Sequence, residues 1–152
     1  MKKITMFLAV VTLFSLVFST GTFAQRGMMW KGGGGWGPGT PYARMYNPQT
    51  LETMSGEVVS IDKITPEKGM SYGVHVILKT IEGMISVHLG PAWYIENQDV
   101  KIVAKDTIEV KGSRITFEGK PALIAMEVKN GEDVLTLRDA NGFPVWSGWR
   151  RR

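Results

Sequence analysis

The chain has 152 residues, no cysteine, and a formal net charge of +4 from 18 basic and 14 acidic side chains. The lack of cysteine excludes disulfides, thiolate metal sites and thiol nucleophiles. Lys2 and Lys3 carry half of the net charge, and three arginines end the chain, so the central part is close to neutral. A strong polyanion-binding field over the body of the protein is therefore not indicated.

The first 24 residues are typical of a secretory signal peptide. Two lysines precede an apolar run from Ile4 to Phe18, and Thr22-Phe23-Ala24 suits a signal peptidase. The apolar run is shorter than the roughly 20 residues that a membrane span needs, so we expect cleavage rather than retention as an anchor. No later segment is long and apolar enough to cross a membrane. We therefore predict an exported protein, periplasmic or secreted, that loses residues 1–24.

Residues 25–50 are rich in glycine and aromatic residues and show no hydrophobic period. This composition predicts a flexible tether. Its aromatic side chains have two possible roles: they form a stacking surface for bases, sugars or another protein, or they fold back on the domain that follows. We favour the second. The aromatic side chains are Trp30, Trp36, Tyr42 and Tyr46.

Short alternating apolar runs separated by glycine turns fill residues 51–138 and predict an all-β domain. The first run contains Gly56, which allows the sharp coiling that a small barrel needs. Pro91 is expected to start a short helix over residues 92–98. Beyond Gly112 the apolar parity shifts by one residue, which indicates a β-bulge.

The order of these elements is three strands, one short helix and at least two further strands. This order predicts a small OB-type barrel of five to six strands, with the helix between strands 3 and 4. The barrel domain is expected to span residues 51–138, and an aromatic and arginine-rich tail to span residues 139–152.

The second and third strands form a hairpin with a well-determined register, because two apolar stripes agree when Lys79 pairs with Met84. This pairing places His75 directly opposite His88 on the other face, with Cβ atoms roughly 4.5–5.5 Å apart. The apolar pairs that it predicts are Leu78 with Ile85, Val76 with Val87, and Val74 with Leu89.

The two histidines are a candidate metal site. They could share a Cu or Zn ion, or bind a haem metal, if a third ligand came from a neighbouring strand or from Met28 or Met29. The alternative, which we favour, is a pair of half-exposed sheet histidines packed near Ile77. No cofactor is required by the sequence.

The aromatic residues Trp93, Tyr94 and Tyr72 are candidate ligand-binding residues, because aromatic rings at a barrel mouth make a stacking platform. Trp93 and Tyr94 would instead plug the barrel end if they belong to the core, and for Trp93 we favour the core. No hydrolase, zinc-protease, phosphate-loop or dinucleotide motif is present, so we predict a non-enzymatic protein.

Nucleic-acid binding is a further alternative. An OB-type barrel would allow it through Trp36 and the terminal arginines Arg150, Arg151 and Arg152. The near-neutral charge after signal removal and the exported address count against it.

The strand motifs Gly56-Glu57-Val58-Val59 and 106–112 resemble the bacterial OB-fold family of small periplasmic proteins, over roughly residues 51–129. The resemblance implies a signal peptide, a five-stranded barrel and an accessory or stress-related binding role without catalysis. The segments 90–94 and 137–146 look closer still to a group of exported bacterial proteins often labelled DNA-binding on OB-fold grounds. Together these features predict an exported binding or accessory protein that recognises a partner protein or a small ligand.

The signal peptide gives a direct prediction: the mature protein begins at Gln25. Ala24→Arg places a large charged side chain where the peptidase requires a small one, and we expect it to leave the precursor uncut. Ala24→Gly, the matched control, keeps a small residue and should be cut normally. Intact-mass spectrometry measures the outcome, and a mature wild-type mass that includes residues 1–24 would contradict the prediction.

Overall fold

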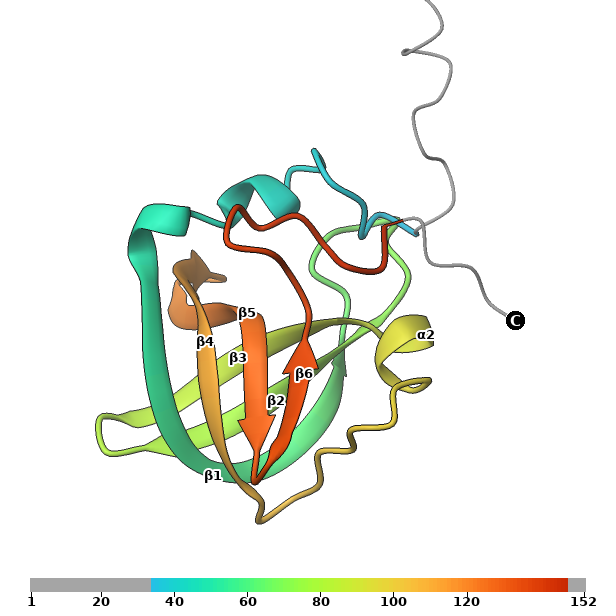
Figure 1. Cartoon of the computed structure of the whole chain (residues 1–152). Helices are drawn as coiled ribbons and strands as arrows, with labels where there is room; N and C mark the ends of the chain where they lie inside the picture. Colours follow the sequence, from blue (N-terminus) through green and yellow to red (C-terminus); the bar gives the residue numbers. More distant parts are fainter. Residues whose placement is uncertain (1–33, 148–152) are drawn as a thin grey trace, which may run out of the picture. The chain divides into compact units, whose positions relative to one another are not determined.

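The computed structural model describes residues 34–147, which form a nearly all-β domain (Figure 1). Within these residues, no helix is long and apolar enough to span a membrane. In chain order the elements are the 3-10 helices η1 (Ala43–Met45) and η2 (Pro48–Thr50), the strands β1 (Leu51–Ile64), β2 (Gly73–Thr80) and β3 (Gly83–Pro91), the helix α2 (Ala92–Ile95), and the strands β4 (Thr107–Phe117), β5 (Lys120–Asn130) and β6 (Asp133–Thr136).

The first five strands close into a barrel. The sheet order is β3-β2-β1-β4-β5-β6, and an additional parallel pairing between β3 and β5 closes the first five strands on themselves. β6 extends the edge by pairing with β5, and the single short helix of the barrel lies between β3 and β4. The predicted fold class, a small barrel of five to six strands with one short helix in that position, is confirmed.

The long first strand makes this closure possible. β1 pairs with β4 from Leu51 to Glu57 and with β2 from Glu57 onward, so one strand serves two parts of the barrel. Gly56 lies where the two pairings meet, and a Cβ there would overlap the carbonyl oxygen of Lys79. Glycine at this position therefore allows the close approach that a strongly coiled strand requires.

The predicted hairpin register is confirmed from Thr80–Gly83 to His75–His88. Beyond this point it is wrong by one residue, because a bulge between Val74 and His75 pairs Val74 with Gly90 instead of Leu89.

The predicted bulge in the fourth strand lies at the expected place in the β4–β5 ladder, between Lys111 and Gly112. The extra residue, however, is Met126 of β5 rather than a residue of β4. Its carbonyl oxygen accepts hydrogen bonds from the backbone N–H groups of Leu137 and Arg138. The irregularity therefore connects the barrel wall to the segment that follows β6.

Residues 34–50, which the sequence assigns to a flexible tether, lie packed on the barrel. Trp36 and Tyr42 are each 2% exposed, and Tyr46 is 8% exposed. The indole N–H of Trp36 donates to the Ser71 carbonyl (2.8 Å), and that of Trp146 donates to the Trp36 carbonyl (2.8 Å). The tether prediction is therefore wrong for these residues, and their aromatic side chains fold back; residues 25–33 lie outside the described part.

We predict that Trp36→Ala lowers the free energy of unfolding by about 3 kcal/mol or more, because it leaves a large cavity between the N-terminal segment and the barrel. Val134→Ala is the matched control: Val134 is 49% exposed, so its truncation should cost no more than about 0.5 kcal/mol. Urea denaturation measures both. A Trp36→Ala effect as small as that of the control would show that the segment is not packed in solution.

Candidate functional site

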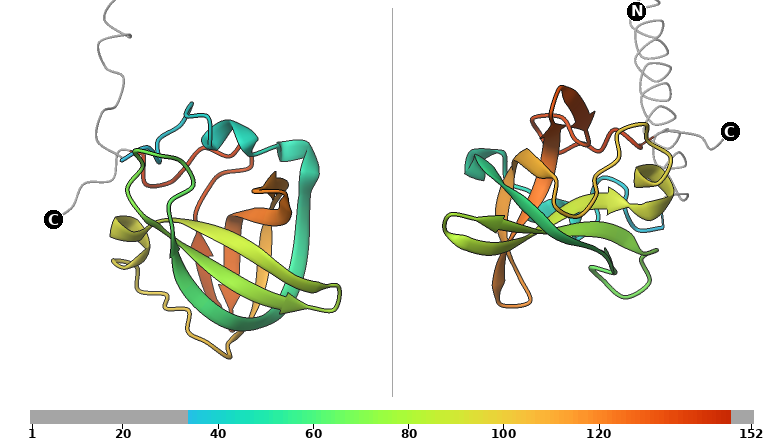
Figure 2. Two further views of the ribbon diagram at one scale, coloured as in Figure 1. Left: turned by 180° about the vertical axis from the view of Figure 1, so that it is seen from behind. Right: turned by 90° about the horizontal axis from the view of Figure 1, so that it is seen from below.

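A groove of about 380 Å³ opens between the first half of β1 and the tip of the β2–β3 hairpin. Residues 52–55 of β1 form one side and residues 80–85 of the hairpin form the other, with Arg114 of β4 and Pro121 of β5 between them. Figure 2 shows, in both views, that the hairpin projects beyond the rest of the barrel. We call this feature the hairpin groove.

The groove exists because β2 separates from β1, and β3 from β5, before these strands end. β2 leaves β1 at Glu57, so residues 52–55 of β1 pair with β4 on one edge and with no described strand on the other. β3 pairs with β5 only over residues 86–88, so residues 83–85 also keep one edge that no described strand pairs with. Backbone N–H and C=O groups along such edges are free to pair with another chain.

Apolar side chains border these edges. Ile81 at the hairpin turn is fully exposed, and Met84 is 61% exposed. Met54 and Ile85 line the floor between them. The groove therefore combines unpaired backbone with exposed apolar surface, which is the combination that an added β-strand requires.

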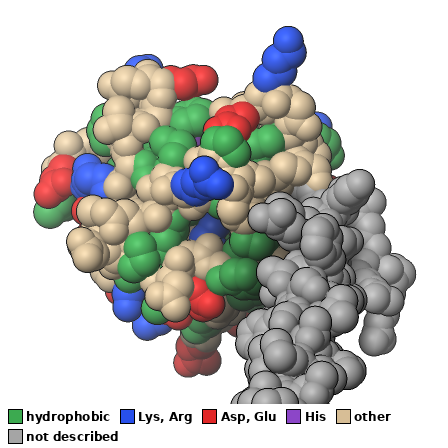
Figure 3. All heavy atoms as spheres, turned by 90° about the horizontal axis from the view of Figure 1, so that it is seen from above, with side chains coloured by type: hydrophobic (Ala, Val, Ile, Leu, Met, Phe, Trp, Pro, Cys, Tyr) green, Lys and Arg blue, Asp and Glu red, His purple; other side chains and the backbone are tan. Residues whose placement is uncertain are grey.

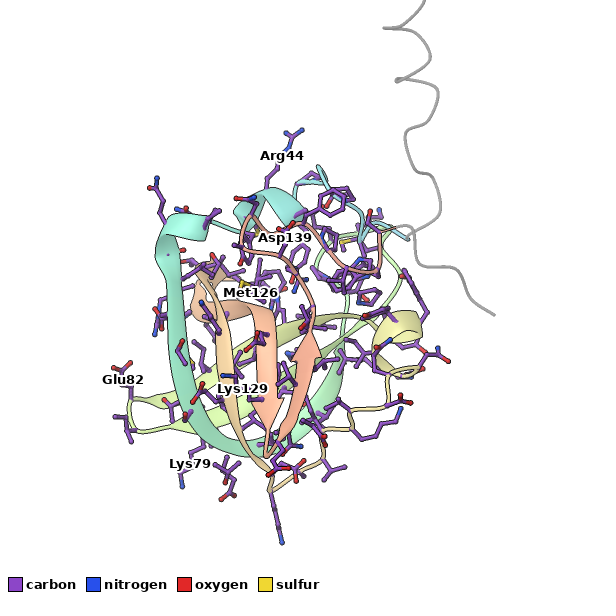
Figure 4. All side chains as sticks on the ribbon, viewed as in Figure 1. Arg44, Lys79, Glu82, Met126, Lys129 and Asp139 are labelled. Atoms are coloured by element: carbon purple, nitrogen blue, oxygen red, sulfur yellow. The ribbon has the colours of Figure 1, made fainter. Side chains whose placement is uncertain are left out.

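One arginine organises the charges in the groove. The Arg114 guanidinium donates from Nε and Nη2 to the Glu52 carboxylate, with an Nη2–Oε1 distance of 2.6 Å. Glu82, labelled at the hairpin tip in Figure 4, lies 3.8 Å from the same nitrogen. The hydrogen bonds from Arg114 lower the pKa of Glu52, and those to Glu52 raise the pKa of Arg114. Glu52 and Arg114 are thus held charged at neutral pH, and the formal charges of two carboxylates and one guanidinium leave one negative charge in excess.

A shallower depression continues on the other side of the Glu52–Arg114 pair. It has a volume of about 470 Å³ and shares Glu52, Arg114 and Pro121 with the hairpin groove. Its remaining lining comes from Thr50, Leu51, Ile115 and Thr116. The ion pair therefore lies in the middle of a longer surface trough.

A second cavity, of about 270 Å³, lies beside the loop that follows α2. Its wall is mostly aliphatic, and Lys101 and Glu96 are its two charged members. Lys101 donates from Nζ to the Glu96 carbonyl (2.9 Å). The aliphatic residues are Ile61, Val74, Leu89, Ile95, Val100, Ile102 and Leu135.

The predicted histidine pair is present, but its environment differs from the prediction. His88 is fully buried rather than half-exposed, because Tyr42 stacks on its ring and Phe117 meets it edge-on. The Tyr42 hydroxyl and His88 Nδ1 are 2.9 Å apart, whereas His88 Nε2 has no hydrogen-bond partner among residues 34–147. His75 Nδ1 is hydrogen-bonded to the Ser86 hydroxyl (2.7 Å).

The pair has little of what a metal centre needs within residues 34–147. The two ring centroids are 6.1 Å apart, and no group of three or more His, Cys, Asp or Glu side chains surrounds them in that range. Both Nδ1 atoms are already hydrogen-bonded. Met28 and Met29, the other proposed ligands, lie outside the described residues. A Cu, Zn or haem site here stays a prediction.

The aromatic candidates do not form one platform. Tyr94 is buried and its ring lies 5.5 Å from that of Trp146, whereas Trp93 is half-buried and packs against the same core. α2 explains the difference, because its single turn directs Ala92 and Tyr94 inward. Tyr72 is 43% exposed, and the Lys63 ammonium lies 4.6 Å from its ring centroid.

The nucleic-acid alternative gains no surface from the described residues. Trp36 is buried and is not available to stack on a base, which corrects its assignment as a contact residue. Figure 3 shows Lys, Arg, Asp and Glu side chains scattered over the visible face, without one basic patch. Arg150, Arg151 and Arg152 lie outside the described residues.

Comparison with known families supplies one match. Residues 50–135 match the model of the MamS/MamX magnetosome protein family. The matched range contains the five barrel strands, α2 and most of β6, and also every residue that lines the hairpin groove. No curated protein matches the chain.

The buried histidine gives a pH prediction. Burial, then the charges of His75 and Arg138, lower the pKa of His88 from 6.5 to about 4. In the unfolded chain His88 therefore binds a proton near pH 6.5, whereas in the folded protein it does so only near pH 4. Between these values we expect a loss of about 3 kcal/mol in the free energy of unfolding.

Urea denaturation at pH 7 and pH 4 measures this loss. His88→Gln should remove most of it, since the variant has no imidazole to protonate at this position. His75→Gln is the matched control and should keep most of it, because burial is the larger cause of the lowered pKa of His88. Equal pH dependence in the wild type and His88→Gln would show that His88 is not the responsible group.

Proposed function

The chain belongs to the MamS/MamX magnetosome protein family, and from this premise we propose that it is an exported, non-enzymatic accessory protein that acts at the magnetosome by binding a partner protein in the hairpin groove. The observation that carries the proposal is the pair of unpaired strand edges beside exposed apolar side chains. A partner segment in extended conformation can pair with the strand edges and cover the apolar side chains at the same time.

The groove suits binding rather than catalysis. Its titratable groups are Glu52, Glu82 and Arg114, and they neutralise one another in part instead of presenting a free acid or base. Neither His75 nor His88 lines the groove. The groups present can hold a peptide by backbone pairing, apolar contact and charge, and none of them is placed as an activated nucleophile.

The excess negative charge of the groove favours a partner segment that carries a basic residue. A segment with an apolar residue to contact Met84 and a basic residue beside Glu82 complements the groove. Glu82 is the more accessible carboxylate, with a side chain that is 78% exposed, compared with 36% for Glu52. Such charges contribute mainly to the choice of partner and to the association rate.

The aliphatic cavity beside the α2–β4 loop supports a second candidate, a small apolar ligand. Its volume is just below the range usual for small-molecule sites, and its lining is of the usual kind. Ile102→Trp would fill this cavity and leaves Met84 in place. If this variant no longer binds an apolar fluorophore that the wild type binds, the small-ligand function is favoured over the partner-protein function.

Site-specific crosslinking tests the partner function. A photo-crosslinking residue at position 84 should trap one discrete partner in the native cell, whereas the same residue at position 103 should not. The two positions are matched in exposure, 61% for Met84 and 56% for Val103. The crosslinked partner is then identified by mass spectrometry and purified.

Affinity for that partner should fall at least tenfold in Met84→Asp, because a buried carboxylate would replace an apolar contact and add to the negative charge of the groove. Val103→Asp should leave affinity unchanged. Calorimetric titration measures both, and thermal unfolding checks that both variants are folded. Equal losses in the two variants, or none in either, would rule out the hairpin groove as the binding site.

A further inference from the structure

The aliphatic cavity beside the α2–β4 loop connects the barrel core with the surface. Two of its walls, Leu89 and Leu135, are core residues that are 1% and 3% exposed, whereas Ile61 at its rim is 37% exposed. The space of about 270 Å³ is therefore lined by aliphatic side chains from the core to the surface. Covering such a surface with an apolar side chain is favourable, because it removes the surface from water.

The last described residues lie beside this cavity. Trp146 is 1% exposed, and a Cβ atom placed on Gly90 would overlap the Trp146 ring and contact the Ile95 methyl group. Gly90 directly follows Leu89, which is a residue of the cavity wall, and Ile95 is another. The Trp146 ring thus packs at the edge of the cavity.

The residues that follow Ser147 combine a large apolar side chain with three cations. They are Gly148, Trp149, Arg150, Arg151 and Arg152, and they lie outside the described residues. A chain spans up to about 3.5 Å per residue, so Trp149, three residues beyond Trp146, can lie as far as about 10 Å from it. Because the cavity begins beside the Trp146 ring, its interior is within reach of the Trp149 indole.

The charges at the rim favour the same placement. Glu96 lines the cavity, and Asp99 precedes the lining residue Val100. Both acidic side chains are exposed, and neither belongs to an ion pair within residues 34–147. Lys101 is the basic residue of the lining and donates to the Glu96 backbone carbonyl. The rim therefore has one negative charge in excess, which a basic segment complements.

We propose that Trp149 docks in the aliphatic cavity of its own chain, with the three terminal arginines beside Glu96 and Asp99. The short connection to Trp146 gives the indole a roughly millimolar effective concentration at the cavity, so a weak contact is enough to fill it. A free apolar ligand has to displace Trp149 before it can enter. The tail therefore controls access to the cavity, and this role is independent of partner binding in the hairpin groove.

Methyl NMR of the mature protein tests the docking. An indole ring shifts the resonances of methyl groups that it contacts, so Trp149→Ala should move the signals of Ile95 and Ile102, which line the cavity. The signal of Ile81, in the hairpin groove, should stay in place. Phe143→Ala is the matched control, because it removes an aromatic side chain that is 51% exposed and is not part of the cavity lining. It should leave all three signals unchanged.

Binding of an apolar fluorophore gives a second measurement. If the tail fills the cavity in about nine of ten molecules, Trp149→Ala should bind the fluorophore about tenfold more tightly than the wild type does. Replacement of the three terminal arginines by serine keeps Trp149 and should tighten binding by a smaller factor. Ile102→Trp fills the cavity and should abolish binding in either background.

Three results would overturn the proposal. The first is an identical position of the Ile95 and Ile102 signals in the wild type and in Trp149→Ala. The second is movement of the wild-type signals on tenfold dilution, which would assign the cavity to the tail of a second copy. The third is equal fluorophore affinity in the wild type and in Trp149→Ala, which would leave the cavity to a free small ligand.

Discussion

The fold depends on one constraint, which is that β1 must pair with β4 along its first half and with β2 along its second. A single strand can do this only if it coils strongly, and Gly56 lets it pass close to the Lys79 backbone at the change of partner. β3 can then reach β5 and close the barrel through three parallel pairs, from Ser86–Ala122 to His88–Ile124. The hairpin groove follows from the same geometry, because the closure ends before the β2–β3 hairpin does.

An aromatic cover over the barrel core is the second main feature of the fold. Segments on both sides of the barrel in sequence, 34–50 and 137–147, lie over its core, and Trp36 and Trp146 are joined by a hydrogen bond. This cover encloses polar groups as well as rings. His88 is satisfied on one nitrogen by Tyr42, and Arg138 by two carbonyl oxygens.

Local pattern was sufficient to predict the barrel, its short helix and the hairpin register, because alternation of apolar residues reports directly on which face of a strand is buried. It failed where the chain departs from regular pairing. A bulge that shifts Val74, and an extra residue at Met126, change the register without changing composition. The glycine-rich composition of the N-terminal segment predicted a flexible backbone, but the three aromatic side chains within residues 34–50 pack against residues far along the chain, and these contacts hold that part in place.

The candidate site was less predictable for the same reason. Glu52 and Arg114 are 62 residues apart in sequence and become a bidentate pair only through the β1–β4 register. Arg138 ends a short apolar run whose alternation would place it on the solvent side, and only the bridge to Pro144 turns the chain back over it. Burial of His88 likewise required Tyr42 from the segment predicted to be a tether.

The charges of the hairpin groove bear on why its unpaired edges are tolerated. An exposed strand edge next to apolar residues invites pairing between identical copies, and charged side chains at the edge oppose this. Two copies joined edge to edge would bring Glu52 and Glu82 of each into one groove, where their excess negative charge is doubled. A partner that carries basic residues meets the opposite condition, since its charge offsets theirs. The arrangement that discourages self-association is thus the one that favours a basic, extended partner.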